Sequence, residues 1–139
     1  MGNEDMGIVG ALGVGADLDA EFRRMPGLLW HWGNLEAVAI EMQLQAKADL
    51  EQKHAEVYKR LRADKSEKLT EAGLEAGIET DPEYSRYRAK YITAEGNAKR
   101  MKAAVMALMS KSRMLEQLGN NNISQQRAGI SDSAKRRVG

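Results

Sequence analysis

Residues 80–118 read TDPEYSRYRAKYITAEGNAKRMKAAVMALMSKSRMLEQL, and this stretch decides the fold of the chain. Apolar and aromatic side chains recur in it at alternating spacings of three and four residues, which places them along one face of an α-helix. Nine of the ten positions in the stripe are apolar or aromatic: Tyr84, Tyr87, Tyr91, Ala94, Ala98, Met101, Val105, Leu108, Ser112 and Leu115. A stripe sustained over more than four heptads predicts a long helix with a coiled-coil or bundle seam.

Both ends of this helix carry capping signals. Asp81 followed by Pro82 suits an N-cap and a first helical residue, and Thr80 with Glu83 fits a capping box equally well. Gly119 is a typical residue just past a helix end, and three asparagines follow it. We therefore expect the helix to begin near Pro82 and to end just before Gly119.

A second long helix is expected upstream. Asn34 is a suitable N-cap, and no glycine or proline occurs between it and Lys65. Apolar side chains follow at close to the helical period: Leu35, Val38, Ala39, Met42, Ala46, Leu50, Val57 and Leu61. Residues 66–80 then contain two glycines and a glutamate at every fourth position. Because like charges at that spacing repel, we expect an acidic connector with about two helical turns that needs a basic surface beside it.

These elements predict three segments. Residues 1–33 are glycine-rich, and Pro26 with Gly27 should interrupt any helix there, so we expect a partly mobile N-terminal segment. We expect residues 34–118 to form one helical domain. Residues 119–139 are polar and end in basic side chains, and we expect a disordered tail.

Composition excludes several protein classes. The chain has 139 residues, of which 21 are basic and 20 acidic, and it contains no cysteine. A disulfide framework or a cysteine-ligated metal site is therefore excluded. The longest apolar run, residues 8–16, is too short for a membrane span, and the acidic start lacks the features of a secretory signal. We expect a soluble cytoplasmic protein without a membrane partner.

Residues 103–109, with the sequence AAVMALM, are apolar on every side of the helix and need burial. A two-helix hairpin hides only one stripe. The predicted fold class is therefore all-α: a long antiparallel helical hairpin that assembles into a homo-oligomeric bundle or ring. The alternative is that residues 1–33 cover this surface in a monomer. The expected oligomerisation residues are Tyr84, Tyr87, Tyr91, Met101, Val105, Met106, Leu108, Met109 and Leu115.

Charge is distributed unevenly along the chain. Residues 1–79 carry 9 basic and 15 acidic side chains, whereas residues 80–139 carry 12 and 5. Antiparallel packing would gather cations from both helices into a track suited to a phosphate backbone. The candidate nucleic-acid-binding residues are Lys59, Arg60, Arg62, Lys65, Arg86, Arg88, Lys90, Lys99, Arg100 and Lys102. The alternative is that these side chains are merely solvated or pair with the glutamates of residues 67–79.

Aromatic side chains are a second candidate for contacts with unpaired bases. The three tyrosines of the stripe fall on the seam, so packing explains them better. Trp30 and Trp32 precede the expected first helix, where they can pack against its start, the connector or a neighbouring subunit, or stack on bases.

No catalytic or metal site is expected. Glu51 and His54 have the Glu-x-x-His spacing of di-iron bundles, but such a site needs a second copy of the motif and two more carboxylates. A glycine cluster at residues 10–15 lacks the strand and the Gly-Lys-Ser/Thr ending of a phosphate-binding loop. With two histidines and no cysteine, the chain offers no nucleophile–base pair. We expect neither an enzyme nor a cofactor; a helical metal enzyme completed by a symmetric dimer is the weaker alternative.

Several short motifs resemble a known family. They are Trp32-x-Asn34, Glu41-Met42, Tyr58, Thr70-Glu71-x-x-Leu74-Glu75-x-x-Ile78, Asp81-Pro82-Glu83-Tyr84, Ala103-Ala104-Val105-x-Ala107-Leu108 and Met114-Leu115-x-x-Leu118-Gly119. Over residues 32–119 this pattern is similar to the UvsY-type recombination mediators of tailed phages. The motifs consist mostly of packing and capping residues.

The resemblance implies a non-enzymatic accessory to homologous recombination and DNA repair. Members of that family form ring-like homo-oligomers, bind single-stranded DNA and help a phage recombinase to load in place of single-strand-binding protein. The recombinase and the single-strand-binding protein are thus implied partners, in the cytoplasm of the host cell. The alternative is a structural or assembly oligomer of a phage particle (a scaffold, a chaperone or a small packaging subunit) without a nucleic-acid function.

Overall fold

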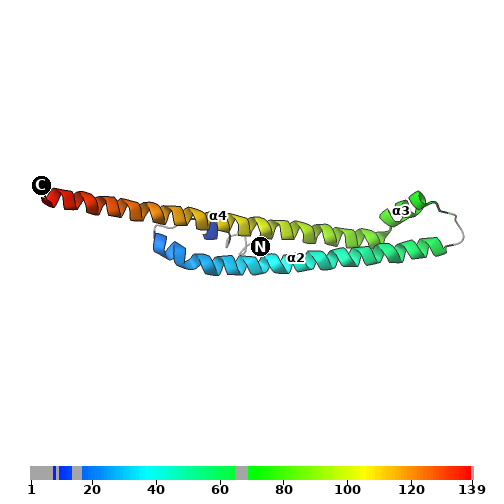
Figure 1. Cartoon of the computed structure of the whole chain (residues 1–139). Helices are drawn as coiled ribbons and strands as arrows, with labels where there is room; N and C mark the ends of the chain where they lie inside the picture. The colour runs from blue at the N-terminus through cyan, green and yellow to red at the C-terminus, as the bar shows by residue number, and fades with distance from the viewer. Residues whose placement is uncertain (1–7, 9, 14–16, 65–68, 139) are drawn as a thin grey trace. The chain divides into compact units, whose positions relative to one another are not determined.

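The computed structural model describes residues 8, 10–13, 17–64 and 69–138, with side chains up to residue 129. In the described part of the chain, α2 (Leu18–Ala63) is followed by α3 (Glu71–Glu79) and α4 (Pro82–Val138) (Figure 1). The described residues contain no β-strand. The predicted all-α class is therefore confirmed. The expected mobility of the glycine-rich start concerns residues that mostly lie outside the described ranges.

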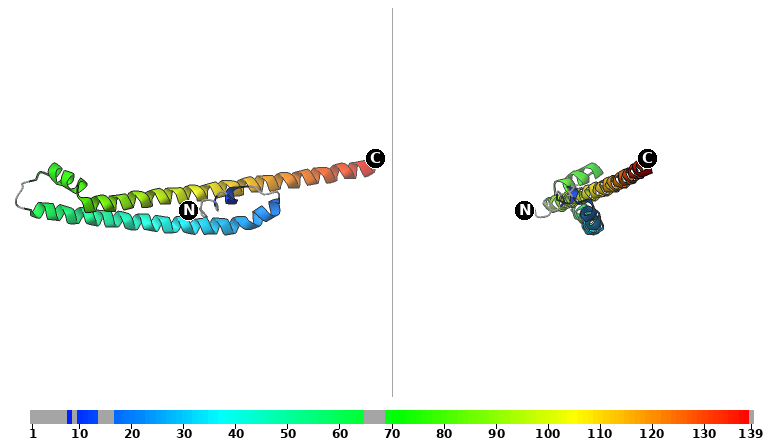
Figure 2. Two further views of the ribbon diagram at one scale, coloured as in Figure 1. Left: turned by 180° about the vertical axis from the view of Figure 1, so that it is seen from behind. Right: turned by 90° about the vertical axis from the view of Figure 1, so that its left-hand side faces the viewer.

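The chain divides into two compact units. The central unit comprises Asn34–Lys102, and the terminal unit comprises Met1–Gly33 together with Ala103–Gly139. In each unit, a segment of α2 and a segment of α4 lie side by side and run in opposite directions (Figures 1 and 2). Antiparallel packing of α2 and α4 is thus present within each unit, and in the central unit it joins the two predicted helices.

The apolar stripe of α4 is buried as the sequence predicts. All ten of its residues, from Tyr84 to Leu115, are buried or half-buried. In the terminal unit, Leu108 and Leu115 are completely inaccessible to solvent. Contacts within one chain therefore bury the stripe. Most of the expected oligomerisation residues belong to this stripe. Met106 and Met109, also expected at the oligomer interface, lie outside the stripe and are 59% and 45% exposed.

The start of α4 is fixed by Asp81. Its carboxylate accepts a hydrogen bond from the backbone amide of Tyr84 (3.0 Å), and Pro82 is the first helical residue. Of the two capping arrangements that the sequence allows, the structure contains this one. Thr80 serves α3 instead, because its hydroxyl donates to the carbonyl oxygen of Ala76 (3.0 Å) at the end of that helix.

The connector contains one short helix, as expected. The hydroxyl of Thr70 accepts a hydrogen bond from the amide of Gly73 (3.1 Å) and caps α3. Gly77 lies where α3 meets α2, since an added Cβ would be only 2.8 Å from Cδ1 of Leu61. A glycine in this helix therefore permits close packing, in addition to weakening the helix in isolation.

Packing of α3 closes the core of the central unit. Val57 of α2, Ile78 of α3 and Tyr84 of α4 form one buried cluster. Side chains of α2 pack around it: Leu50, Tyr58 and Leu61. Burying an aliphatic side chain of this size contributes about 1.5–3 kcal/mol, so the cluster holds all three helices of this unit together.

The predicted start of the first long helix is wrong. Instead of beginning at Asn34, α2 begins at Leu18 and continues through Pro26. A proline inside a helix removes one backbone hydrogen bond and costs about 3 kcal/mol. Met25 and Trp32 on the same helix are both buried. Their burial, at about 1.5–3 kcal/mol each, offsets the cost of the proline.

The predicted end of the second long helix is also wrong. Rather than stopping before Gly119, α4 continues to Val138, so residues 119–138 extend a helix where we expected a disordered tail. Gly119 accommodates the ring of Phe22, because an added Cβ would be 3.2 Å from its Cζ atom. All side chains from 120 to 129 are exposed. No apolar stripe in the sequence therefore predicts that α4 continues beyond Gly119.

Candidate functional site

The acidic connector faces basic side chains, as the spacing of its glutamates requires. Three residues of α3 pair with side chains of the long helices: Glu71 with Arg62 (3.3 Å), Glu75 with His54 (3.4 Å) and Glu79 with Arg88. The fourth glutamate of the row, Glu67, lies outside the described residues. The expectation of a basic surface beside this helix is confirmed for Glu71 and Glu79, whereas the partner of Glu75 is a histidine that is charged only when protonated. Their pairing also uses two of the arginines assigned to nucleic-acid binding.

Nine of the ten candidate nucleic-acid-binding residues are described by the structure, and they fall into two groups. Four are exposed but lie in ion pairs with carboxylates: Arg60 with Asp81, Arg62 with Glu71, Arg88 with Glu79 and Lys99 with Glu95 (2.9 Å). Among the described residues, five are exposed and have no carboxylate within ion-pair distance: Lys59, Arg86, Lys90, Arg100 and Lys102. Lys65 lies outside the described residues. The five cations without a carboxylate partner are the better candidates for binding an external anion.

Three of these cations share one side of α4. Arg86, Lys90 and Arg100 are separated by four and ten residues, with Thr93 and Asn97 between them on the same side. We call these five residues the basic face. It lies within the central unit and extends over about 21 Å at 1.5 Å per residue. The ammonium of Lys90 lies 5.2 Å from the centre of the Tyr87 ring on the same helix. The basic face therefore presents three cations that have no carboxylate within ion-pair distance among the described residues.

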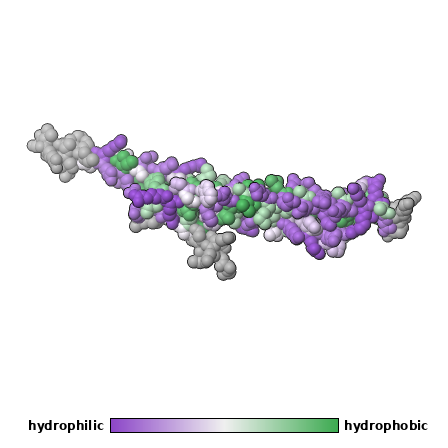
Figure 3. Space-filling model, turned by 90° about the horizontal axis from the view of Figure 1, so that it is seen from below, coloured by the Kyte–Doolittle hydropathy of each residue, from purple (hydrophilic) through white to green (hydrophobic). Residues whose placement is uncertain are grey.

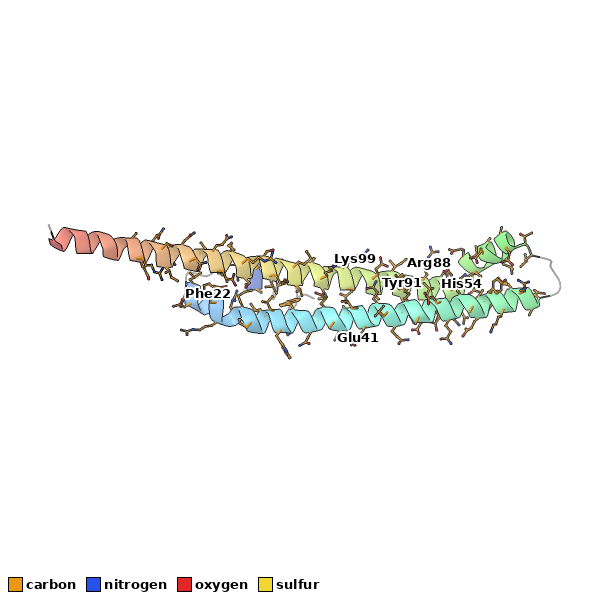
Figure 4. All side chains as sticks on the ribbon, viewed as in Figure 1. Phe22, Glu41, His54, Arg88, Tyr91 and Lys99 are labelled. Atoms are coloured by element: carbon orange, nitrogen blue, oxygen red, sulfur yellow. The ribbon has the colours of Figure 1, made fainter. Side chains whose placement is uncertain are left out.

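The paired cations of α4 also point outward. Arg88 and Lys99 project from the side of α4 that faces away from α2, whereas His54 and Tyr91 lie between the two helices (Figure 4). Hydrogen bonding to Glu95 raises the pKa of Lys99 above its usual value. Exposed ion pairs of this kind are weak and are screened by salt. They can open when a phosphate competes for the cation.

Asp81 forms an ion pair with Arg60 and also caps the start of α4 in the central unit. The backbone amide of Tyr84 and, to a smaller extent, the guanidinium of Arg60 hold the pKa of this carboxyl below its usual value. Arg60 was a candidate for nucleic-acid binding, but here it contacts the residue that caps α4. Its charge has a structural partner that the sequence pattern did not reveal.

The aromatic residues that were candidates for base stacking also differ in their surroundings: some are buried and one is exposed. Trp32 is buried, and its ring meets that of His31 edge-on with centroids 5.6 Å apart. Trp30 is 74% exposed. Packing of Trp32 against the protein is therefore observed, while Trp30 presents its ring to solvent. The three stripe tyrosines are buried or half-buried, which agrees with packing.

A buried ion pair in the terminal unit was missed by the sequence analysis. Lys111 is 4% exposed, and its Nζ lies 2.7 Å from Oε2 of Glu21. The same ammonium donates hydrogen bonds to the carbonyl oxygens of Ala11 and Gly13, the second at 2.5 Å. All three ammonium protons therefore have acceptors. Arg24 adds a second contact to Glu21, at 3.2 Å from Nε.

The position of Lys111 in the sequence was the available signal. It follows Leu108 by three residues and precedes Leu115 by four, which places it on the buried side of α4. Through it, residues before Gly33 are fastened to α4. The alternative in which N-terminal residues cover α4 is thus realised on one side of the helix, yet Met106 and Met109 stay exposed.

An open groove also lies in the terminal unit, between the start of α2 and α4. It is lined by Asp17, Leu18, Asp19, Phe22, Glu116, Gly119, Asn120, Asn122, Ile123 and Gln126. Its three carboxylates make it unsuitable for a phosphate backbone. The cationic candidate site is therefore placed on the basic face and not in this groove.

Comparisons with protein-family models, with curated proteins and with solved structures found no match. Within the described ranges, no three histidine, aspartate or glutamate side chains gather closely enough to hold a metal ion. The helices there also lack any segment that is both long enough and apolar enough to cross a membrane.

Proposed function

We propose that this chain is a non-enzymatic, self-associating protein that binds single-stranded DNA and acts as a recombination mediator. In this proposal α2 and α4 form one long antiparallel hairpin, and several copies assemble into a bundle or ring. The observation that carries the proposal is the basic face, because Arg86, Lys90 and Arg100 present cations without carboxylate partners. Cations aligned on a repeating platform bind phosphate backbones by releasing counterions.

The resemblance to UvsY-type mediators supplies the biological role. On that basis, the oligomer holds single-stranded DNA while a recombinase replaces single-strand-binding protein, in the cytoplasm of a phage-infected cell. Trp30 supports the same role, since an exposed indole provides a stacking surface for an unpaired base.

Fluorescence anisotropy with a labelled oligonucleotide tests DNA binding. The variant Arg86→Glu/Arg100→Glu should bind more weakly, and the slope of log affinity against log salt should fall by about 1.4, at 0.7 per phosphate contact. The matched control is Arg23→Glu/Arg127→Glu, which changes the net charge equally at exposed positions outside the basic face. A wild-type chain that does not bind at low salt, or equal weakening in both variants, would contradict the proposal.

A second candidate function is that of a structural or assembly oligomer of a phage particle. The exposed apolar side chains favour it, because such side chains mark interaction surfaces when they cluster. It predicts self-association without affinity for DNA. Incorporation of the chain into purified particles, together with a negative anisotropy result, would favour this function over the first.

A further inference from the structure

We propose that copies of this chain associate head to tail. An apolar face of α2 in one copy binds a methionine-containing face of α4 in the next copy. This inference rests on the self-association contained in the proposed function, and it adds which two surfaces meet. It concerns different residues from the basic face.

The first surface lies on α2 within the central unit. Ala37, Ile40, Leu44 and Ala48 follow one another at spacings of three and four residues and share one side of the helix. We call them the α2 apolar face. All four are exposed, and the exposed fraction reaches 61% for Leu44. Residues on another side of the helix, including Ala39 and Val57, pack inside the chain, so α2 is apolar on two separate sides.

The second surface lies on α4. Lys99, Lys102, Met106, Met109 and Arg113 recur at spacings of three, four, three and four, and all five are exposed. We call them the α4 methionine face. Its two methionines are the large side chains of the all-apolar segment 103–109 that remain exposed, at 59% for Met106 and 45% for Met109. Figure 3 shows hydrophobic patches that reach the surface between hydrophilic side chains on one side of the molecule.

The two faces differ in the charges beside their apolar centres. Three glutamates and one lysine border the α2 apolar face: Glu36, Glu41, Glu51 and Lys47. Glu41 projects from α2 away from α4 (Figure 4). The α4 methionine face carries three basic side chains, and Glu95 and Glu116 lie next to it along the helix. The α2 apolar face thus has an excess of negative charge and the α4 methionine face an excess of positive charge, so pairing one face with the other is electrostatically better than pairing either with itself. The fitting occupant of each face is therefore the other face of a second copy.

An antiparallel register illustrates the fit. When Ile40 and Leu44 are placed opposite Met109 and Met106, Glu51 falls opposite Lys99. At the other end, Glu36 falls beside Arg113, whereas Lys47 meets a like charge at Lys102. Because Lys99 already pairs with Glu95 in its own helix, the interface adds a second carboxylate to it. Lys99 and Lys102 would then be covered in the oligomer, which leaves DNA to the basic face.

Pairing two different faces has a consequence for assembly. After two copies bind, the pair still has one free face of each kind, so association continues until a ring closes or a filament forms. An interface in which one face binds its own counterpart would stop at two copies. The proposed pairing of two different faces can therefore be tested with two variants of the chain, each of which has one face blocked.

The test uses Leu44→Glu to block the α2 apolar face and Met106→Glu to block the α4 methionine face. Sedimentation velocity should show each variant as a single 15.4 kDa copy. An equimolar mixture should form a two-copy complex, because each variant supplies the face that the other has lost. Controls are Gln45→Glu and Ser110→Glu, exposed neighbours outside the two faces, which should retain the wild-type assembly.

Three results would overturn the inference: a mixture that stays single-copy, a variant that keeps the wild-type assembly, or a wild-type chain that does not associate. The last result also ends the self-association in the proposed function, whereas the first two leave self-association and DNA binding intact. Circular dichroism verifies that each variant is helical. If Met106→Glu loses helicity, Met109→Glu replaces it in the same mixture.

Discussion

Replacing Lys111 with methionine should destabilise the terminal unit strongly, because it removes the ammonium that fastens N-terminal residues to α4. The methionine keeps the length of the buried stem and loses only the charge and its hydrogen bonds. Glu21 would keep Arg24 but lose a partner at 2.7 Å, and the carbonyl oxygens of Ala11 and Gly13 would lose their donor.

The magnitude follows from the burial of the pair. The Lys111 and Glu21 side chains are almost completely buried. Removing one member of such a pair costs about 3–5 kcal/mol, because the other charge stays buried without compensation. The remaining contact from Arg24 places the expected loss at the lower end, about 3 kcal/mol. The double variant Glu21→Leu/Lys111→Met should be less destabilised than Lys111→Met alone, since it leaves no buried charge.

Urea unfolding followed by circular dichroism at one fixed protein concentration measures this loss. Arg127→Met, an exposed arginine of the same helix, should change the free energy of unfolding by no more than about 0.5 kcal/mol. If Lys111→Met behaves like this control, the ion pair does not fasten the N-terminal residues and the reasoning is refuted.

Three further predictions concern packing, helix propensity and pH. Leu115→Ala should cost about 2–5 kcal/mol in urea unfolding because the side chain is fully buried, whereas Met114→Ala, at an exposed position, should cost much less. Gly73→Ala should raise the melting temperature, as alanine favours a helix by up to about 1 kcal/mol, but Gly77→Ala should gain less because its methyl group would meet α2 at 2.8 Å. The lowered pKa of Asp81 means that its contribution to stability is present above about pH 4 and is lost as the pH falls through its folded value. Asp81→Asn should therefore lower the melting temperature at neutral pH and reduce its decrease on acidification; equal acid sensitivity in both chains would contradict this.

The sequence predicts those features of the fold that arise from periodic burial. The stripe from Tyr84 to Leu115 repeats for more than four heptads, and its burial in the structure follows that repeat. The end signals are less informative, because a local rule is outweighed by distant contacts. Pro26 is tolerated inside α2 where Met25 and Trp32 are buried, and Gly119 serves the approach of Phe22 instead of ending α4.

The candidate site was harder to predict, since a sequence gives charges without their partners. Arg60 and Arg62 belong to a basic cluster in the sequence, yet the fold places carboxylates of Asp81 and Glu71 beside them. Lys111 looks like a surface lysine until its position between two buried leucines is considered. The acidic row of the connector was a stronger signal, because its own repulsion required cations nearby.

Sedimentation velocity of the unmodified chain at micromolar concentration tests the central claim most directly. Both the proposed binding of DNA by an oligomer and the proposed head-to-tail association of copies depend on self-association. We predict a helical species that contains several copies of the 15.4 kDa chain. A well-folded species with the mass of one copy would contradict the claim.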